Sequence, residues 1–323
     1  MRSLARAMAP IDETCVVKLA NEPIVNHGRE VSRFFREEPA TARSAKFPHP
    51  PIKDYGIIGD CRTAALISRE GSIDWLCLPD FSSPSIFGRI LDRETGGLFL
   101  IRPRGEFTAT RRYIDKTTPV LETTFEAPQG AVRLTDVAPV IDGAGSLQPM
   151  REMLRLIEGL SGELELEIRI DPRPHYGRTK PRVKDHGKLG WCYSWANELL
   201  TVRSDIDLSR TGNAVHATVR VCAGERIRVS LSYVKGDVGV LSLLGHEADE
   251  RLARTVKWWR GWAARCGYDG PYKDAVLRSA LTLKLLTFSL SGAIIAAPTA
   301  SLPEAIGGNR NWDYPIAGCA MPG

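Results

Sequence analysis

The stretch YGIIGDCRTAALISREGSIDWLCLPDFSSPS, residues 55–85, decides the fold of this chain. Its short apolar runs are separated by Gly59-Asp60 and Glu70-Gly71, two pairs of residues that favour tight turns. The spacing predicts a strand, a turn, a second strand, a turn and a third strand. Such a meander belongs to an antiparallel sheet, so the first expectation is a β-rich protein.

Apolar and polar residues alternate in further segments up to about residue 240, which is the pattern of half-buried strands. The clearest segments are Glu163–Ile170, Arg226–Val234 and Pro119–Glu126. We expect their buried faces to consist of Leu164, Leu166, Ile168 and Ile170, of Ile227, Val229, Leu231 and Tyr233, and of Leu121, Thr123 and Phe125. One apolar and one polar face on each strand predict antiparallel sheets that pack on each other.

The periodicity becomes helical after about Gly245. Apolar residues recur every three or four positions between Glu247 and Arg265, which predicts an amphipathic helix. Gly270-Pro271 is a plausible start for a second helix, because proline is tolerated in a first turn. The following segment, Ala275–Phe288, is so apolar that we expect it to be buried.

Length and composition exclude several classes of protein. The chain has 323 residues, of which 43% are hydrophobic and 25% charged, as in a soluble globular protein of about two domains. The net charge of +5 is spread along the chain, so we expect no nucleic-acid partner. The most apolar segment, 281–298, is interrupted by polar residues and ends in proline, so we also expect no membrane span.

The first residues lack the apolar run of a secretion signal, so we expect a cytoplasmic protein. Seven scattered cysteines without a CxxC pair indicate reduced thiols rather than disulfides or a zinc site. The six histidines show no metal-binding spacing, and no metal or cofactor is expected. Residues 1–50 combine charge with several prolines and are expected to be a partly disordered leader.

Two sets of residues have both a functional and a structural interpretation. Asp60, Asp74 and Asp80 could supply a catalytic carboxylate, but an aspartate beside Gly or Pro usually forms a turn. Trp191 and Trp195 could line a sugar cleft, but aromatic residues on a strand more often belong to the core. We favour the structural interpretation for both sets.

A second informative stretch, SGAIIAAPTASLPEAIGGNRNWDY, occupies residues 291–314. A loop of small residues is followed by Arg, Asn, Trp, Asp and Tyr within five positions. A sugar offers one apolar face that can stack on an aromatic ring and hydroxyls that need polar partners. The composition of this segment is therefore compatible with a sugar site.

Both stretches resemble those of bacterial glycoside hydrolase family 15, the glucoamylase and trehalase-like enzymes. The resemblance covers about residues 52–314. It implies a trehalase-like N-terminal β-supersandwich at 51–245, a linker helix at 246–270 and, at 271–323, the first helix of an (α/α)6 barrel. By the same resemblance, the enzyme hydrolyses α-glucosidic bonds with inversion, and Arg310, Trp312 and Asp313 approach the innermost sugar.

The resemblance also shows what these 323 residues lack. Inversion uses two carboxyl groups about 6.5–9.5 Å apart, and in the family both are glutamates deep in the barrel. Only 53 residues follow Gly270, whereas twelve helices with loops need roughly 200. Neither glutamate has a counterpart, so we assign no catalytic residue and expect the chain to be inactive.

The departure from the family begins at Pro315. The family continues after Asn-Trp-Asp-Tyr with a run like Arg-Tyr-Cys-Trp-Leu-Arg-Asp-Ala, whereas this chain continues with PIAGCAMPG. Codons for the latter, read in a shifted frame, can encode most of the former. We therefore expect a one-base deletion, in the gene or in its sequencing, and hence a truncated chain.

The expected partner is an α-glucoside or oligosaccharide. Two alternatives remain at this point: a non-catalytic carbohydrate-binding or scaffolding β module, and a fragment of a phosphorolytic relative. An isolated first barrel helix would also leave an apolar face exposed, which predicts self-association.

Overall fold

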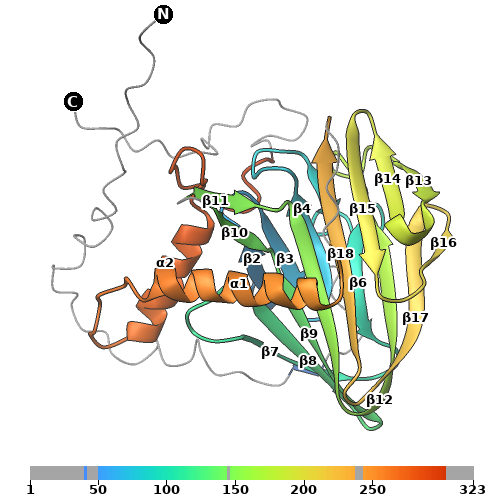
Figure 1. The fold of residues 1–323 in the computed structure, drawn as a ribbon, viewed down its shortest axis with the longest axis horizontal. Helices are drawn as coiled ribbons and strands as arrows, with labels where there is room; N and C mark the ends of the chain where they lie inside the picture. Colours follow the sequence, from blue (N-terminus) through green and yellow to red (C-terminus); the bar gives the residue numbers. More distant parts are fainter. Residues whose placement is uncertain (1–39, 42–49, 144–145, 237–242, 303–323) are drawn as a thin grey trace, which may run out of the picture. The chain divides into compact units, whose positions relative to one another are not determined.

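A computed structural model describes residues 40–41, 50–143, 146–236 and 243–302 (Figure 1). Antiparallel strands dominate these ranges, and the two α-helices come last in sequence. The prediction of a mainly β, antiparallel fold is therefore confirmed. The strands are β1 (Ala40–Thr41), β2 (Tyr55–Gly59), β3 (Ala64–Ser68), β4 (Ser72–Cys77), β5 (Ser85–Gly88), β6 (Leu98–Pro103), β7 (Thr108–Tyr113), β8 (Leu121–Ala127), β9 (Gly130–Val137), β10 (Val140–Gly143), β11 (Ser146–Pro149), β12 (Glu152–Asp171), β13 (Arg182–Asp185), β14 (Trp191–Trp195), β15 (Glu198–Ser204), β16 (Ser209–Thr211), β17 (Ala214–Cys222) and β18 (Arg226–Lys235).

The predicted meander of residues 55–85 is present. β2 pairs with β3 and β3 pairs with β4, all antiparallel, with the two expected turns between them. The Asp60 carboxylate forms the first turn by accepting the backbone N–H groups of Arg62 and Thr63, at 2.9 and 2.8 Å. Every residue of β4 is buried, because both of its faces are covered.

Two sheets share one long strand, β12. The first sheet has the order β1-β7-β8-β9-β12-β18-β15-β14-β13. The second contains β2, β3, β4 and β6 on one side of β12 and β17 and β16 on the other, with β5 paired to β4. The first half of β12, Glu152–Glu158, pairs with β18, whereas the second half pairs with β17 over Glu163–Ile170. The strand therefore passes from one sheet to the other.

Two glycines make this passage possible. The pairing of β12 with β9 is irregular between Gly159 and Ser161. A Cβ atom on Gly159 would lie 2.0 Å from the carbonyl oxygen of Cys222, and one on Gly162 would lie 2.0 Å from that of Gln129. Gly162 also has a φ of +55°, which L-residues adopt at a cost. Only glycine fits at either position.

The main core lies between the two sheets and contains the predicted faces. Ten of the eleven residues predicted from alternation belong to this core. The eleventh, Thr123, is also fully buried, between Leu121 and Phe125 in the sequence of β8. Arg155 crosses this core. Its Nε donates to Oδ1 of Asp136 at 2.7 Å, and its two terminal nitrogens donate to the carbonyl oxygens of Phe99 and Gly71. One buried cation thus joins strands of both sheets.

Helix α1 (His246–Ala263) lies across the outer face of the first sheet (Figure 1). Its Ala248 and Val256 pack against Leu154 of β12 in a small separate cluster. On the same helix, Arg251 forms a buried ion pair with Glu152 of β12, at 3.1 Å. The predicted amphipathic helix is present, but it ends at Ala263 rather than at Arg265.

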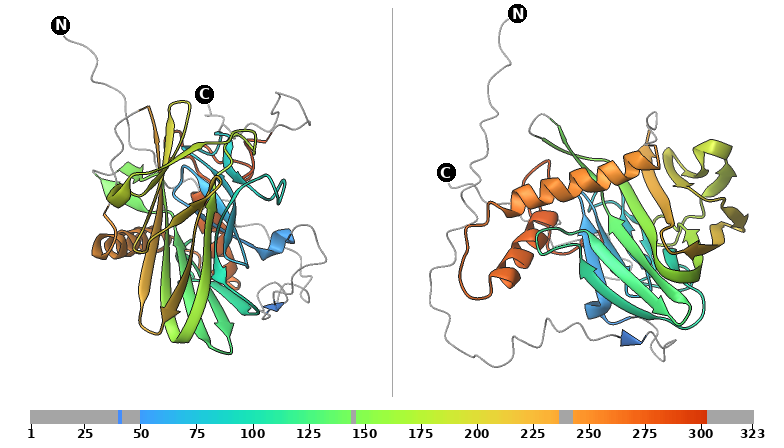
Figure 2. Two further views of the ribbon diagram at one scale, coloured as in Figure 1. Left: turned by 90° about the vertical axis from the view of Figure 1, so that its right-hand side faces the viewer. Right: turned by 60° about the horizontal axis from the view of Figure 1, so that its bottom comes forward.

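Helix α2 (Lys273–Leu285) packs against the C-terminal end of α1, as the right-hand view of Figure 2 shows. Two expectations about it need correction. The helix ends three residues before Phe288, because the Phe288 N–H instead donates to the carbonyl of Ala293 and closes a turn. Burial is also one-sided: Leu281 and Leu285 are buried, but Leu283 is 49% exposed.

The β7–β8 connection holds both helices. Asp115 accepts hydrogen bonds from Arg260 of α1, at 2.8 Å for its Nε. Arg278 of α2 lies over the ring of Tyr113, 3.9 Å from its centre, and donates to the carbonyl oxygens of Thr118 and Asp115. This loop therefore fixes α2 on the sandwich by polar contacts as well as by apolar packing.

Candidate functional site

The predicted sugar-binding residues Arg310, Trp312 and Asp313 lie outside the described residues, which end at Leu302. The structure does describe the segment that leads to them, residues 286–302. We call this segment the approach segment. It lies against the sandwich at two points, and both points are formed by the stretch 55–85 that defines the fold, joined at the second point by Tyr176.

The first contact point lies directly after α2. The Ser289 N–H donates to the carbonyl oxygen of Cys61 at 2.8 Å, and the Arg62 side chain donates to the Ser289 hydroxyl at 3.3 Å. Phe288 meets Phe81 edge to face, with ring centres 6.4 Å apart. The β2–β3 turn and the loop after β4 therefore form a docking surface for the start of the approach segment.

The second contact point lies at the end of the described chain. The Trp75 indole N–H donates to the carbonyl oxygen of Pro298 at 2.8 Å, and the Tyr176 hydroxyl donates to that of Ser301, also at 2.8 Å. The rings of Trp75 and Tyr176 lie 6.3 Å apart. The Cys77 thiol and the Ser301 hydroxyl are separated by 3.4 Å. Three side chains of the sandwich thus contact two residues of the approach segment, Pro298 and Ser301.

Burial strongly affects the titratable groups beneath the approach segment. It raises the pKa of the Cys61 and Cys77 thiols to about 12, so both stay protonated and unreactive at neutral pH. Burial also raises the pKa of the Asp60 carboxyl to about 6. The hydrogen bonds from the backbone N–H groups of Thr63 and Arg62 lower this pKa, but burial has the larger effect. The two thiols are packing groups, and the Asp60 carboxyl is 1% exposed and holds the β2–β3 turn.

The other two candidate carboxylates, Asp74 and Asp80, differ in their partners. Asp74 lies in the middle of β4, not in a turn, and accepts hydrogen bonds from Tyr55, Ser72 and Arg89. Burial raises the pKa of Asp74, while the Arg89 charge opposes that shift. Asp80 is in a turn, where its carbonyl oxygen accepts the N–H of Ser83. The Oδ1 atom of Asp80 is buried without a hydrogen-bond partner among the described residues. Asp60 and Asp74 are each 1% exposed, so neither has the open position that general acid or base catalysis needs.

The tryptophans of β14 belong to the sandwich, as the structural interpretation predicted. Trp195 is 7% exposed and packs against Tyr233, with ring centres 6.4 Å apart. Trp191 is half-buried and donates its indole N–H to the carbonyl of Leu208 at 3.2 Å. Neither ring presents an open face with convergent polar groups.

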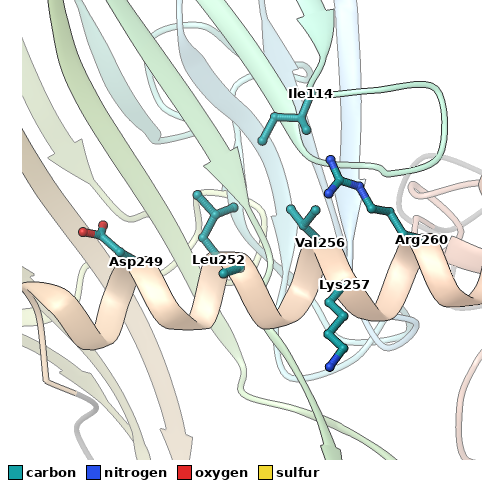
Figure 3. Close-up of a pocket in the computed structure, with 7 residues that line it drawn as sticks. Ile114, Asp249, Leu252, Val256, Lys257 and Arg260 are labelled. Atoms are coloured by element: carbon teal, nitrogen blue, oxygen red, sulfur yellow. The ribbon is translucent and has the colours of Figure 1, made fainter.

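A groove of about 400 Å³ runs along α1 (Figure 3). Leu252 and Val256 point towards Ile114, whereas Lys257 points away from them. The other charged groups at its rim are already paired, Asp249 with Arg228 and Arg260 with Asp115. The groove is therefore an apolar surface feature without the polar groups that orient a sugar.

Two features are absent from the described ranges, a cluster of metal-ligating side chains and a helix that could span a membrane. Within them, no group of three His, Cys, Asp or Glu side chains could hold a metal ion. Neither of the α-helices there is long and apolar enough to cross a membrane.

The sequence alone identified part of this site. The stretches 55–85 and 291–314 both stand out as unusual, but nothing in the sequence indicates that they touch. Tyr176 was missed entirely, because a single tyrosine in a Pro-rich connection carries no pattern. Only the backbone conformation in the structure marks Tyr176 as unusual, because His175, Tyr176 and Gly177 all have positive φ angles.

Comparison with known proteins gives a consistent result. A family model described as "Trehalase-like, N-terminal" matches residues 46–232. The chain is 35% identical over 272 residues to a trehalase of Thermoplasma volcanium, and 34% identical over 297 residues to a trehalase of Mycolicibacterium smegmatis. These matches cover 82% and 85% of this chain but only 42% and 44% of those proteins. The chain thus spans less than half the length of either relative.

A solved structure supports the same fold. The structure of a bacterial glucoamylase complexed with acarbose aligns with 81% of this chain and 44% of its own, with a TM-score of 0.50 and 12% sequence identity. At that identity the likeness concerns the fold alone.

Proposed function

The chain belongs to the trehalase-like N-terminal family, among relatives of the glycoside hydrolase family 15 type, and from this premise we propose that it serves an enzyme that hydrolyses α-glucosidic bonds. In this proposal the β-sandwich is the scaffold and the residues after the approach segment bind the sugar. The observation that carries the proposal is the docking of residues 286–302 on the stretch 55–85.

We assign sugar binding to Arg310, Trp312 and Asp313. An indole ring can stack on the apolar face of a glucose unit, while a guanidinium and a carboxylate can hold its hydroxyls. The expected ligand is an α-glucoside such as trehalose or a maltose-type oligosaccharide. We expect the 323 residues by themselves to bind such a ligand without cleaving it, because neither carboxyl group of an inverting pair is recognised in them.

Titration calorimetry with trehalose and with maltose tests this proposal, together with an assay for released glucose. We expect binding heat for at least one sugar, no glucose, and about ten-fold weaker binding in Trp312→Ala. Trp191→Phe is the matched control, since it changes a tryptophan of the sandwich, and it should bind as the unaltered chain does. Equal affinity in Trp312→Ala would contradict the site assignment, and release of glucose would contradict the expected inactivity.

We extend the proposal to location and to self-association. Cys61, Cys77, Cys192, Cys222 and Cys266 are free thiols in the described ranges, which supports a cytoplasmic protein. Leu283 and Leu290, 49% and 66% exposed, support association of copies through α2 and the turn that follows it. A monomer in sedimentation at all concentrations would contradict self-association.

A further inference from the structure

The turn between β2 and β3 is where the sandwich meets α2 and the approach segment. The Cys61 thiol donates to the carbonyl oxygen of Lys284, in the last turn of α2, at 3.3 Å. The Cys61 carbonyl oxygen accepts the N–H of Ser289, in the approach segment, at 2.8 Å. One residue of the turn thus contacts both parts of the chain that dock on the sandwich.

A single carboxyl group holds this turn. Oδ1 of Asp60 accepts the N–H groups of Arg62 and Thr63, so the side chain spans the backbone of Cys61. Cys61 has a φ of +64°, a region that residues other than glycine adopt at a cost, and the two hydrogen bonds stabilise it there. A change in the Asp60 carboxyl therefore acts on the residue that contacts α2 and the approach segment.

Asp60 differs from the other buried acids in the part of the chain that the structure describes. It is 1% exposed and forms no ion pair there. Each of the other five is paired with an arginine, namely Asp74 with Arg89, Glu122 with Arg112, Asp136 with Arg155, Glu152 with Arg251 and Asp171 with Arg173. A buried carboxylate without a counter-charge is costly, and the group avoids that cost by taking up a proton.

The Arg62 guanidinium does not supply the missing ion pair. Its Nε donates to the hydroxyl of Ser289 at 3.3 Å, so the side chain is directed at the approach segment. Its charge lowers the pKa of Asp60, but burial has the larger effect and raises that pKa to about 6. The carboxyl therefore changes its charge in mildly acidic solution.

The elements packed against the turn do not supply it either. Beside their contacting residues they carry the Cys61 thiol, Lys284 of α2, Asp80 in the loop after β4 and Arg260 of α1. The thiol stays protonated because burial raises its pKa to about 12, and Arg260 is already paired with Asp115. Lys284 forms no ion pair with Asp60 in the described structure, and residues 286–302 contain no charged side chain. Asp60 therefore lacks a cation that would hold it ionised.

We propose that Asp60 is a pH-sensitive switch for the docking of α2 and the approach segment. The protonated carboxyl fits the buried turn, whereas the carboxylate is more stable in water. Leu285 of α2 covers the turn so closely that a Cβ atom on Gly59 would lie 2.9 Å from it. Opening of residues 273–302 therefore uncovers the turn and lets the carboxyl release its proton to water. This inference does not depend on sugar binding.

The pH dependence of docking has a definite direction. The pKa of Asp60 is about 6 when the turn is covered and falls towards the ordinary value of 3.8 when water reaches the carboxyl. The proton is therefore bound more tightly in the docked state. Docking is strongest below about pH 4 and weakens as the pH rises through about 6.

Native-state hydrogen exchange in residues 273–302 of the whole chain, between about pH 5 and pH 7.5, tests this proposal, with β12 as the internal reference. The rates are corrected for the intrinsic pH dependence of amide exchange. Asp60→Asn keeps an oxygen that can accept the two N–H groups but cannot ionise. Asp115→Asn is the matched control, because Asp115 also contacts a helix through Arg260, but hydrogen bonds from Thr117 and Arg260 lower its pKa and keep it ionised throughout this range.

We expect the opening equilibrium of residues 273–302 in the unaltered chain to rise about ten-fold over this range. Asp60→Asn should abolish the rise, whereas Asp115→Asn should open more readily at every pH and keep the ten-fold rise. An opening equilibrium independent of pH in the unaltered chain, or the same rise in Asp60→Asn, would overturn the switch. An equal rise in β12 would also overturn it, because the carboxyl would then meet water only on global unfolding. The unaltered chain alone decides the first and last of these outcomes, so the test holds even if a variant does not fold.

Discussion

The core between the two sheets and the cluster beneath the helices are built in different ways. The sheet core contains more than thirty buried residues, shares strand β12 between both layers and is crossed by the Arg155–Asp136 ion pair. The cluster beneath α2 contains nine buried residues, which come from both helices, from the approach segment and from the sandwich, among them Leu281, Leu285 and Phe81. The first region can hold itself together, whereas the second depends on the surface that the first provides.

This difference suggests different roles for the two regions, the sandwich as a scaffold and residues 286–302 as part of the functional segment. The sandwich is held by strand pairing and by its own large core, so we expect it to keep its structure without the approach segment. Residues 286–302 are instead held by a few hydrogen bonds, among them that of Trp75, and by the packing of Leu286, Phe288 and Ile295 in the cluster that contains Phe81. Segments that bind ligands are commonly drawn from such weakly held parts of a protein. The following substitutions test how independent the two regions are.

The largest effect is expected at the passage of β12 between the sheets. Gly162→Ala should lower the free energy of unfolding by about 4 kcal/mol, because the new methyl group meets the Gln129 carbonyl and the φ angle is positive. Gly224→Ala is the matched control, since its φ is +85° but nothing lies within 4 Å. Chemical denaturation should show about 1–2 kcal/mol for the control. Equal losses would mean that close packing at the passage is unimportant.

A smaller and local effect is expected in α2. Leu285→Ala removes a side chain that is 1% exposed, and such changes cost about 3 kcal/mol. We expect hydrogen exchange to rise across 273–302 while β9, β12 and β18 keep their protection. Leu283→Ala, at a 49% exposed position of the same helix, should leave both regions unchanged. Loss of protection throughout β12 in Leu285→Ala would show that the two regions unfold together.

Asp60 holds the β2–β3 turn, on which the approach segment docks, and makes stability depend on pH. Its folded-state pKa of about 6 lies above the ordinary value of 3.8 because the carboxyl is buried. The stability that this group contributes is therefore present below about pH 4 and is lost as the pH rises through about 6. Asp60→Asn keeps the oxygen that accepts the Arg62 and Thr63 N–H groups but cannot ionise.

The stability of Asp60→Asn relative to the unaltered chain should thus increase between about pH 4 and pH 7, by up to about 3 kcal/mol. Denaturant titrations at each pH measure this difference. A difference that stays constant over the range, or that falls, would contradict the buried position of the carboxyl.

The smallest effect is expected at the turn between β14 and β15, far from the approach segment. Ala196 has a φ of +45° and is exposed, so Ala196→Gly should relieve strain and stabilise the sandwich by about 0.5–1 kcal/mol. Thermal unfolding should show a higher midpoint without any change of exchange in 286–302. Destabilisation would indicate that Ala196 makes contacts that outweigh its strain.

The sandwich could be predicted well from the sequence, because alternation reports directly on which side of a strand is buried. The faces around Leu166, Val229 and Phe125 were all identified in this way. The full extent of β12 was not, since Gly159 and Gly162 interrupt the pattern where the strand changes sheets. Nor was the early end of α2, where apolar residues such as Phe288 leave the helix to pack on Phe81.

The candidate site was predictable only in part. Composition marked residues 291–314, but alternation and spacing describe neighbours along the chain and say nothing about contacts 125 or 223 residues apart, as at Tyr176 and Trp75. Such contacts depend on how finished elements pack. Arg310, Trp312 and Asp313 remain predictions that sugar binding must test.

The independence of the two regions is tested most directly by native-state hydrogen exchange on the unaltered chain at increasing denaturant. We predict that residues 273–302 open with a lower free energy and at lower denaturant than β12, which should exchange only on global unfolding. Two separate units would support a self-sufficient sandwich that carries a weakly held binding segment. A single unit, with equal opening free energies and equal denaturant dependence in both regions, would contradict it.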